Sequence, residues 1–351
     1  MEFIFTDEQV MIGETAKAFF SENATSERTR AAMAGTGIDR ALWDSFCTEL
    51  GLSGIGLPEA MGGAGLGMVE FAIISEAAGA QVAALPLLGL ATVAQALAAG
   101  GTAAQQGEDL PNLVSGGAIG AFAESDDLRF ADGVLNGSAA FVAHGAVADL
   151  FLLAAQDGAW LVKAGTPGLT ITAHTTMDQT RPYATLTLTN VAAAPLADAK
   201  AAIAAAHAGA CVCLSAEALG GAQAALDRTV AYAKDRIQFG RPIGSFQAYK
   251  HRLADMVVEI EQARSAVYWA ACTVDEGSDE AALALHAAKS FAADTFFKCA
   301  ADMIQLHGGI GFTWEHDAHL FFKRARAIQT MMGSGQWHRE QVATMILGEA
   351  A

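Results

Sequence analysis

The stretch YAKDRIQFGRPIGSFQAYKH, Tyr232–His251, decides the fold because it joins two helical patterns through a turn with distinctive chemistry. It places Arg236, Gln238 and Phe239 directly before Gly240, in a chain whose formal net charge is −17. A guanidinium presents a planar fork of donors that fits phosphate oxygens, and a neighbouring aromatic side chain can cover a nucleotide ring. A solvated basic patch is the simpler interpretation of RIQFG alone. A second glycine-rich stretch downstream favours a bound dinucleotide.

The composition describes a folded globular protein with an acidic surface. Its 351 residues are 52% hydrophobic and 17% charged, which allows a substantial core. The 38 acidic against 21 basic residues argue against a nucleic-acid partner, because phosphate backbones need extended basic surface. The five cysteines are scattered, so we expect neither a disulfide framework nor a metal site. The N-terminus lacks a basic region typical of signal peptides, which points to the cytoplasm.

One uncharged segment, Ala77–Gly107, is longer than a membrane span needs. It consists mostly of alanine and glycine and is interrupted by glutamines and Pro86. We therefore expect a buried helix pair with a break at Pro86, and no membrane partner.

The pattern of apolar and turn-forming residues along the chain predicts an α+β fold with three domains. Residues 1–112 read as an N-terminal helical domain, and residues 113–195 as a small antiparallel β domain of short apolar runs separated by turns. Residues 196–351 are helical again, with long helices from about Phe246 to Asp275 and from Asp279 to His307. This last region is expected to form a four-helix bundle.

Local signals support these elements. Thr6, followed by an acidic turn, predicts the cap of the first helix. Asp132-Gly133 and Asn136-Gly137 supply turn chemistry within the β domain.

The order α, β, α, with RIQFG in one late helix pair and QLHGGIGFTWEHDAHLFFKRA (Gln305–Ala325) in the next, resembles the acyl-CoA dehydrogenase family over nearly the whole chain. The resemblance implies noncovalent FAD and a tetramer built as a dimer of dimers. It also implies a shared flavin, whose ring lies against the β domain of one subunit while its ADP half reaches the C-terminal helices of a neighbour. An electron-transfer flavoprotein is the implied electron acceptor.

The chemistry that the resemblance implies is α,β-dehydrogenation of an acyl-CoA thioester. A carboxylate removes the α-proton while the β-hydride moves to the flavin. Burial of such a carboxylate raises its pKa and strengthens it as a base.

By resemblance, the ADP-binding half of the site is intact. The residues assigned to the cofactor are Arg236, Gln238, Phe239, Gln247, Gln305, Gly308, Gly309, Ser334 and Gln336. The first three match the family's pyrophosphate-contacting segment, and Gly308 and Gly309 match a Gly-Gly pair that lets the backbone approach the cofactor closely. Ser334 and Gln336 align with the Thr and Gln of the family's Tyr-Glu-Gly-Thr-x-Gln.

The ring-binding half departs from the family pattern. The stretch AFAESDDLRF, Ala121–Phe130, stands where the family has Thr-Glu-Pro-Gly-x-Gly-Ser-Asp, and it retains Glu124. Ala143 replaces the threonine that typically bonds the flavin ring, and alanine has no hydrogen-bonding side chain. Ring binding by this β domain is therefore expected to be lost.

The catalytic base is also absent from its usual place, because Met332 replaces the glutamate of the family pattern. Some members carry the base on an earlier helix, at a position that falls near Ala210. Glu217 lies two turns further along the same helical face. It is either a displaced base or a buried carboxylate paired with a cation such as Arg228 or Arg236, and we favour the pair.

These features suggest one subunit of a heteromeric acyl-CoA dehydrogenase, whose related partner chain holds the flavin ring, the glutamate and most of the acyl-CoA. The sequence resembles the shorter, base-lacking subunit of two-chain enzymes in bacterial steroid side-chain degradation. Three alternatives stay open. They are a self-sufficient homotetrameric dehydrogenase using Glu217, a flavoprotein of the same fold with oxidase or monooxygenase chemistry, and a scaffold without catalytic function.

Overall fold

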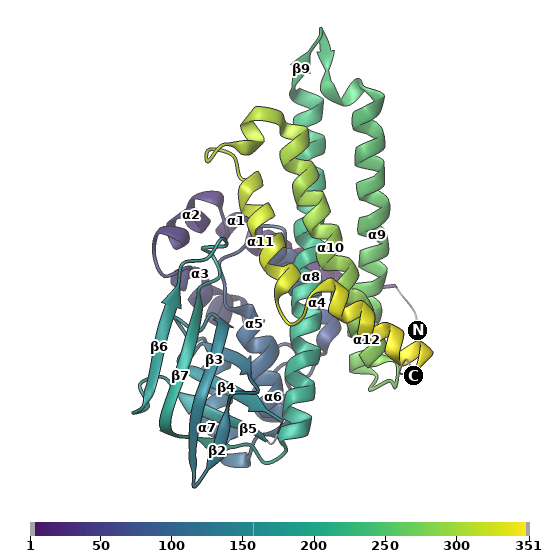
Figure 1. Cartoon of the computed structure of the whole chain (residues 1–351). Coiled ribbons are helices and arrows are strands. Elements are labelled where there is room, and N and C mark those ends of the chain that lie inside the picture. The colour runs from purple at the N-terminus through teal and green to yellow at the C-terminus, as the bar shows by residue number, and fades with distance from the viewer. Residues whose placement is uncertain (1–3, 157, 349–351) are drawn as a thin grey trace. The chain divides into compact units, whose positions relative to one another are not determined.

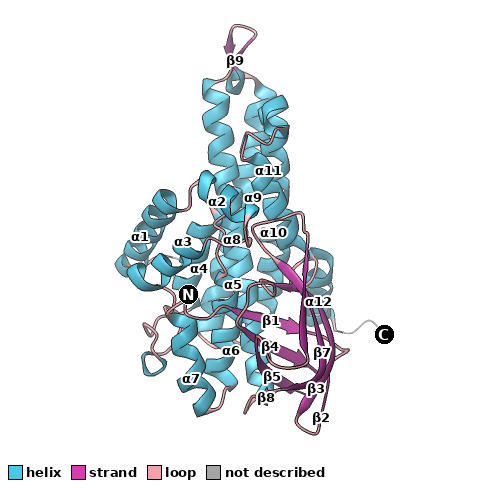
Figure 2. Cartoon of the chain, turned by 90° about the vertical axis from the view of Figure 1, so that its left-hand side faces the viewer, coloured by secondary structure: helices cyan, strands magenta, loops and turns pink. Residues whose placement is uncertain are grey.

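A computed structural model describes residues 4–156 and 158–348. Helices extend to Val114, strands occupy Gly120–Pro195, and helices resume at Ala199 (Figures 1 and 2). The predicted α+β architecture is therefore confirmed.

By backbone contacts the chain divides into two compact units. The first unit contains the chain up to Ser26, Met68–Ala83 and everything from Cys211, and the second contains Glu27–Gly67 and Ala84–Ala210. These units group the elements differently from the domains 1–112, 113–195 and 196–351, whose boundaries stay predictions.

The first unit is helical and includes the C-terminal bundle. Its helices are α1 (Asp7–Asn23), α4 (Met68–Gly79), the part of α8 (Ala199–Asp235) that follows Ala210, α9 (Gln247–Asp275), α10 (Ala281–His307), α11 (Ala318–Thr330) and α12 (Gly335–Leu347). The bundle helix α10 contacts α9, α11 and α12. The predicted helices near 246–275 and 279–307 are confirmed as α9 and α10. Thr6 forms a capping box with Gln9 at the start of α1, as predicted.

Two glycines let α4 and α8 of the first unit approach at backbone distance. A Cβ on Gly79 would overlap the carbonyl oxygen of Glu217, and a Cβ on Gly220 would overlap the carbonyl oxygen of Glu76. Each helix thus presents a glycine to the backbone of the other, and the contact is specific to residues without a side chain.

Apart from the part of α8 up to Ala210, the helices of the second unit are short. They are α2 (Ser26–Ala34), α3 (Arg40–Ser45), α5 (Leu87–Gly89), α6 (Gln95–Gly100) and α7 (Ala103–Val114), with π-helical turns at Phe46–Leu50 and Leu90–Ala94 and a 3-10 turn at Glu59–Met61. Pro86 precedes α5, so the predicted break is confirmed. Among the described residues, α8 alone has the length and composition to cross a bilayer, but 72% of its apolar window is buried inside the protein.

Two four-stranded sheets make the β portion of the second unit. One has the order β1 (Gly120–Glu124), β4 (Leu150–Ala155), β5 (Gly158–Lys163), β8 (Ala194–Pro195), and the other has the order β2 (Arg129–Ala131), β3 (Val134–Ala143), β7 (Tyr183–Ala192), β6 (Leu169–His174). Buried residues of both sheets, including Leu135, Phe151 and Leu186, form one core between them. The antiparallel prediction is confirmed with one exception, because β1 pairs with β4 in parallel.

Of the predicted turns at Asp132-Gly133 and Asn136-Gly137, the first is confirmed and the second is wrong. Asp132 (φ 51°) and Gly133 (φ 81°) form the tight turn between β2 and β3. Asn136-Gly137 instead lies inside β3, at a shift in the pairing register with β7. Gly137 is required there because a Cβ would overlap the carbonyl oxygen of Asp127.

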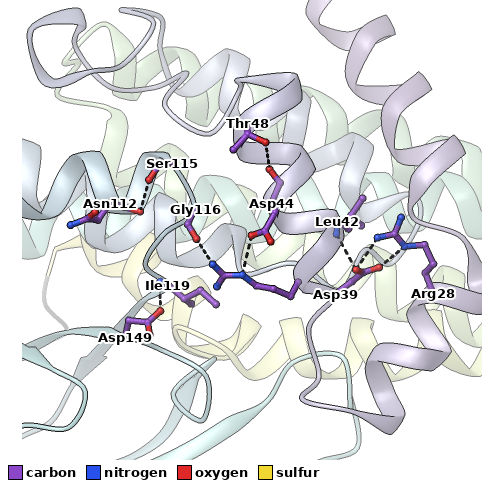
Figure 3. A network of polar contacts seen from close by, with 11 residues as sticks. Arg28, Asp39, Leu42, Asp44, Thr48, Asn112, Ser115, Gly116, Ile119 and Asp149 are labelled. Atoms are coloured by element: carbon purple, nitrogen blue, oxygen red, sulfur yellow. Dashed lines mark hydrogen bonds and ion pairs between the residues drawn. The ribbon is translucent and has the colours of Figure 1, made fainter.

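A polar network fastens the short helices of the second unit (Figure 3). Asp39 accepts from the Leu42 amide at 3.0 Å, capping α3, and pairs with Arg28 of α2 at 2.6 Å. The Arg40 guanidinium donates to the Gly116 carbonyl at 2.7 Å, just beyond α7. The Arg40 bond ties α3 to the segment that leads into β1.

We expect Gly220→Ala to lower the free energy of unfolding by about 1–3 kcal/mol, because the new methyl group forces α4 and α8 apart. Gly107→Ala is the matched control. Gly107 is an exposed residue of α7 with no atom near its Cβ position, so alanine there should stabilise by about 0.5–1 kcal/mol. Urea unfolding of both variants measures the difference, and equal effects would disprove the close helix contact.

Candidate cofactor site and active site

The RIQFG stretch forms a hairpin at one end of the helices of the first unit (Figure 1). After α8 ends, β9 (Ile237–Gln238) pairs with β10 (Arg241–Pro242). Phe239 (φ 54°) and Gly240 (φ 76°) make the two-residue turn. Positive φ is unfavourable for a bulky residue, so the turn holds Phe239 in a strained conformation. Its ring is 90% exposed.

The end of α10 lies at the same end of the first unit. The Tyr249 hydroxyl donates to the Leu306 carbonyl at 2.7 Å, and the ring of Tyr232 stacks on His307 at 4.4 Å between centroids. These contacts join the end of α8, the start of α9 and the end of α10. Burial lowers the pKa of His307, which favours a neutral ring in the stack.

These contacts gather most of the predicted cofactor residues. Those at this end of the first unit are Arg236, Gln238, Phe239, Gln247, Gln305, Gly308 and Gly309. All are exposed. No atom lies within 4 Å of a Cβ built on Gly308 or Gly309, so open space borders the backbone there. Gly308 ends α10 with φ 63°, a conformation that favours glycine.

Ser334 and Gln336 lie elsewhere on this subunit, at the start of α12. Ser334 accepts from the Trp337 amide at 3.2 Å and caps that helix. Arg339 of α12 pairs with Asp294 of α10 at 2.8 Å. Asp294 precedes Gln305 by eleven residues, which is about 16 Å along a helix axis. Within one chain, Ser334 and Gln336 are therefore separate from the hairpin end.

Glu217 is a buried member of an ion pair with Arg324 of α11. The predicted buried pair is confirmed, but its proposed partners were wrong. Arg228 pairs with Asp317 at 3.2 Å, and Arg236 stands exposed at the hairpin. Arg324 follows Glu217 by 107 residues, and no local pattern links the two.

The positions that would serve the flavin ring and an earlier-helix base lie in the second unit. Ala143 ends β3, and Ala210 is fully buried in α8. Glu124, at the end of β1, bonds the Nε2 atom of His207 at 2.8 Å, and this hydrogen bond lowers the pKa of Glu124. The contact of His207 with Glu124 was not predicted from the sequence. His207 lies on α8 one turn before Ala210, and this position could have indicated that it lies near the expected site.

The segment where the resemblance expects the C-terminal base lies between α11 and α12. Met332 (φ 54°) and Gly333 (φ 101°) both have positive φ. The Nζ atom of Lys289, buried in α10, donates to the Ile328 carbonyl at 2.9 Å near the end of α11. Burial lowers the pKa of Lys289 to about 8.

The chain therefore fits one half of a dinucleotide cofactor. The hairpin offers a guanidinium and an aromatic ring, and the adjacent glycines leave space for a close approach. At the positions where the resemblance expects a bond to the flavin ring or a base, the chain carries Ala143, Met332 and Ala210. Among residues 4–156 and 158–348, no group of three or more His, Cys, Asp and Glu could hold a metal ion.

Comparisons with known proteins identify the family. Residues 6–117 match the model of the acyl-CoA dehydrogenase N-terminal domain, and residues 200–347 that of the C-terminal domain. Acyl-CoA dehydrogenase IpdE2 of Mycolicibacterium smegmatis is 36% identical over 335 residues, covering 93% of this chain and 95% of that protein.

Solved structures agree. A variant of the Tcur3481-Tcur3483 steroid ACAD is 32% identical with a TM-score of 0.87, covering 97% of this chain and 98% of that one. The ChsE4-ChsE5 complex from Mycobacterium tuberculosis is 28% identical with a TM-score of 0.90, covering all of both chains. The chain belongs to the acyl-CoA dehydrogenase family, and its cofactor is FAD.

We expect Arg324→Met to lower the free energy of unfolding by about 3–5 kcal/mol, because it leaves the Glu217 carboxylate buried without its cation. Adding Glu217→Gln should restore most of that loss. Arg228→Met is the matched control, since its pair is partly exposed and should cost about 1 kcal/mol or less. Urea unfolding measures all four proteins. A catalytic role for Glu217 would instead show as a loss of about 100-fold or more in flavin reduction by the refolded Glu217→Gln protein.

Lys289 should make stability rise at alkaline pH. Its pKa is about 8 in the folded protein against 10.5 in the unfolded chain, so the unfolded state binds more protons between these values. The cost of burying the charge is fully present below pH 8 and is relieved as pH rises toward 10.5, by about 3 kcal/mol in total. The difference in unfolding free energy between wild type and Lys289→Met, measured across this range, should shift in favour of wild type. A pH-independent difference would contradict the lowered pKa.

Proposed function

We propose that this chain is one subunit of an FAD-dependent acyl-CoA dehydrogenase that catalyses α,β-dehydrogenation of an acyl-CoA thioester. It contributes the ADP-binding half of a shared FAD site to a related catalytic chain. The exposed end formed by Arg236, Gln238, Phe239, Gln305 and Gly309 meets the partner's cofactor.

The observation that carries this proposal is the exposure of that end of the first unit. Phe239 is 90% exposed in a strained turn, and the large apolar side chains Ile237, Phe312 and Trp314 are exposed with it. Soluble proteins seldom leave aromatic side chains clustered in water, and aromatic residues are enriched at protein interfaces. The end is therefore suited to a partner surface and its nucleotide.

The reacting groups belong to the partner in this proposal. FAD supplies the acceptor for the β-hydride. The α-proton needs a carboxylate, and this chain has Met332 and Ala210 at the two positions the family uses. The Glu217 carboxylate forms an ion pair with Arg324. The base and the ring-binding residues are therefore assigned to the catalytic chain, and this chain orients the ADP half.

The proposed substrate class is a steroid-derived acyl-CoA. This rests on the similarity to a steroid ACAD built from two named chains. The proposed electron acceptor is an electron-transfer flavoprotein, and a solved structure 27% identical to this chain is reported for the electron transferring flavoprotein of Acidaminococcus fermentans. The ion pair of Glu217 weighs against the homotetrameric alternative with a displaced base.

The FAD content of this chain purified alone should be close to zero, and it should rise to about one per pair of chains on co-expression with the related catalytic chain. Absorbance of denatured protein measures the stoichiometry. About one FAD per polypeptide in the isolated chain would show that its own β domain holds the ring, and would overturn the shared site.

In the reconstituted complex, Arg236→Ala should weaken FAD retention by about tenfold or more, because a charge-assisted bond to phosphate is lost. Lys234→Ala removes a nearby exposed positive charge outside the hairpin and serves as the control. Equilibrium dialysis of the complex measures both. Unchanged affinity of the Arg236→Ala complex would favour the scaffold alternative.

A further inference from the structure

We infer that His286 of α10 is a positioning residue for the start of α12, acting through His338, and that this histidine pair makes the docking of α12 depend on pH. The two Nδ1 atoms lie 2.8 Å apart, with ring centroids at 5.0 Å. His338 is 1% exposed. The ring of Trp337 packs edge-on against both imidazoles, at 5.4 Å from His286 and 4.9 Å from His338.

The contact between the two nitrogens fixes how many protons the pair can hold. One Nδ1 must carry a hydrogen and the other must present a lone pair. A first added proton can enter at the Nε2 atom of the donating ring and leave the contact intact. A second proton has to occupy the accepting Nδ1, which sets two N–H groups and two positive charges against each other. The doubly protonated pair is therefore incompatible with the docked geometry.

The pair holds more than one helix turn in place. The Nε2 atom of His338 lies 3.2 Å from the position of a Cβ on Gly333, and Trp337 atoms lie at 2.5 Å and 3.0 Å from the same position. His338 is thus wedged between His286 and the segment that leads into α12. Its displacement moves Ser334, which caps α12, and Gln336. The consequence for FAD rests on the proposed function together with the family resemblance, which assigns Ser334 and Gln336 to the cofactor.

The neighbouring charges do not explain a transition in the same pH range. Lys289, one turn after His286, donates to the Ile328 carbonyl, and its pKa of about 8 keeps it mostly charged below neutrality. Asp294 pairs with Arg339 at 2.8 Å and accepts from Gln329 at 2.8 Å. Imidazole is the side chain that ordinarily titrates between pH 5 and 8.

The exposed carboxylates nearest in sequence, Glu280 before α10 and Glu340 on α12, face solvent. In the inferred switch, the two imidazoles are the groups that take up protons at the contact.

The first measurement is the fluorescence of Trp337 against pH, taken as the difference between the wild-type complex and Trp337→Phe. We expect a reversible change between about pH 7.5 and about pH 5.5, the range in which imidazole titrates. His286→Asn places an uncharged amide where Nδ1 stood and should abolish the change with pH, measured against the variant's own spectrum at pH 7.5 because Trp337 loses one of its two imidazole neighbours. His286→Ala should shift the spectrum at every pH. His174→Gln, whose Nε2 partner is Thr185 in the second unit, should keep the wild-type transition.

The second measurement is FAD retention in the same complexes. Wild type should lose affinity by about tenfold or more between about pH 7.5 and about pH 5.5. His286→Asn should not, because His338 is then the only imidazole at the contact and its protonated Nδ1 can donate to the amide oxygen. A transition that survives in His286→Asn, or none in wild type, overturns the inference. A fluorescence transition without a change in FAD affinity supports the pH-dependent docking and overturns its link to the cofactor. The FAD stoichiometry of the isolated chain at neutral pH tests the proposed function separately.

Discussion

The close packing of α4 against α8 in the first unit is the constraint on which the other features of that unit depend. Gly79 meets the backbone of Glu217, and Gly220 meets the backbone of Glu76. At this distance the two helices cannot shift relative to each other to admit a larger side chain, because a single added methyl group overlaps a carbonyl oxygen. The two glutamates therefore have fixed backbones, and what their side chains can reach is decided by the helix pair.

Both carboxylates are used to fasten further helices. The Glu76 carboxylate accepts from Arg264 and from the Tyr268 hydroxyl, each at 2.6 Å, which fixes α9. Glu217 pairs with Arg324, which fixes α11. An ion pair as buried as that of Glu217 is costly to break, because either partner alone is a desolvated charge. A base has to give up and accept a proton during turnover, so the same constraint that builds the unit argues against Glu217 as a base.

Sequence reasoning recovered the features that are local in the chain. The capping box of Thr6, the break at Pro86 and the extents of α9 and α10 follow from short patterns that the structure keeps. Features that depend on long-range contacts escaped it. The partner of Glu217 lies 107 residues away, and the His286–His338 contact spans 52 residues. Asn136-Gly137 also escaped sequence-based prediction. This dipeptide is typical of a turn, but it lies inside β3, at a shift in the pairing register with β7.

The strain at the hairpin gives the strongest reason to regard the exposed end as functional. A positive φ at Phe239 destabilises the isolated subunit. The side chain is 90% exposed, so burial of its ring does not offset that cost. A packing explanation fails, because Phe239 contacts little beyond the edge of Phe246, at 6.1 Å between centroids. Backbone strain persists where a later interaction compensates for it. A nucleotide and a partner surface laid over Phe239 would bury the ring and use the conformation that the turn already holds, which would account for a strained, exposed aromatic residue at this end.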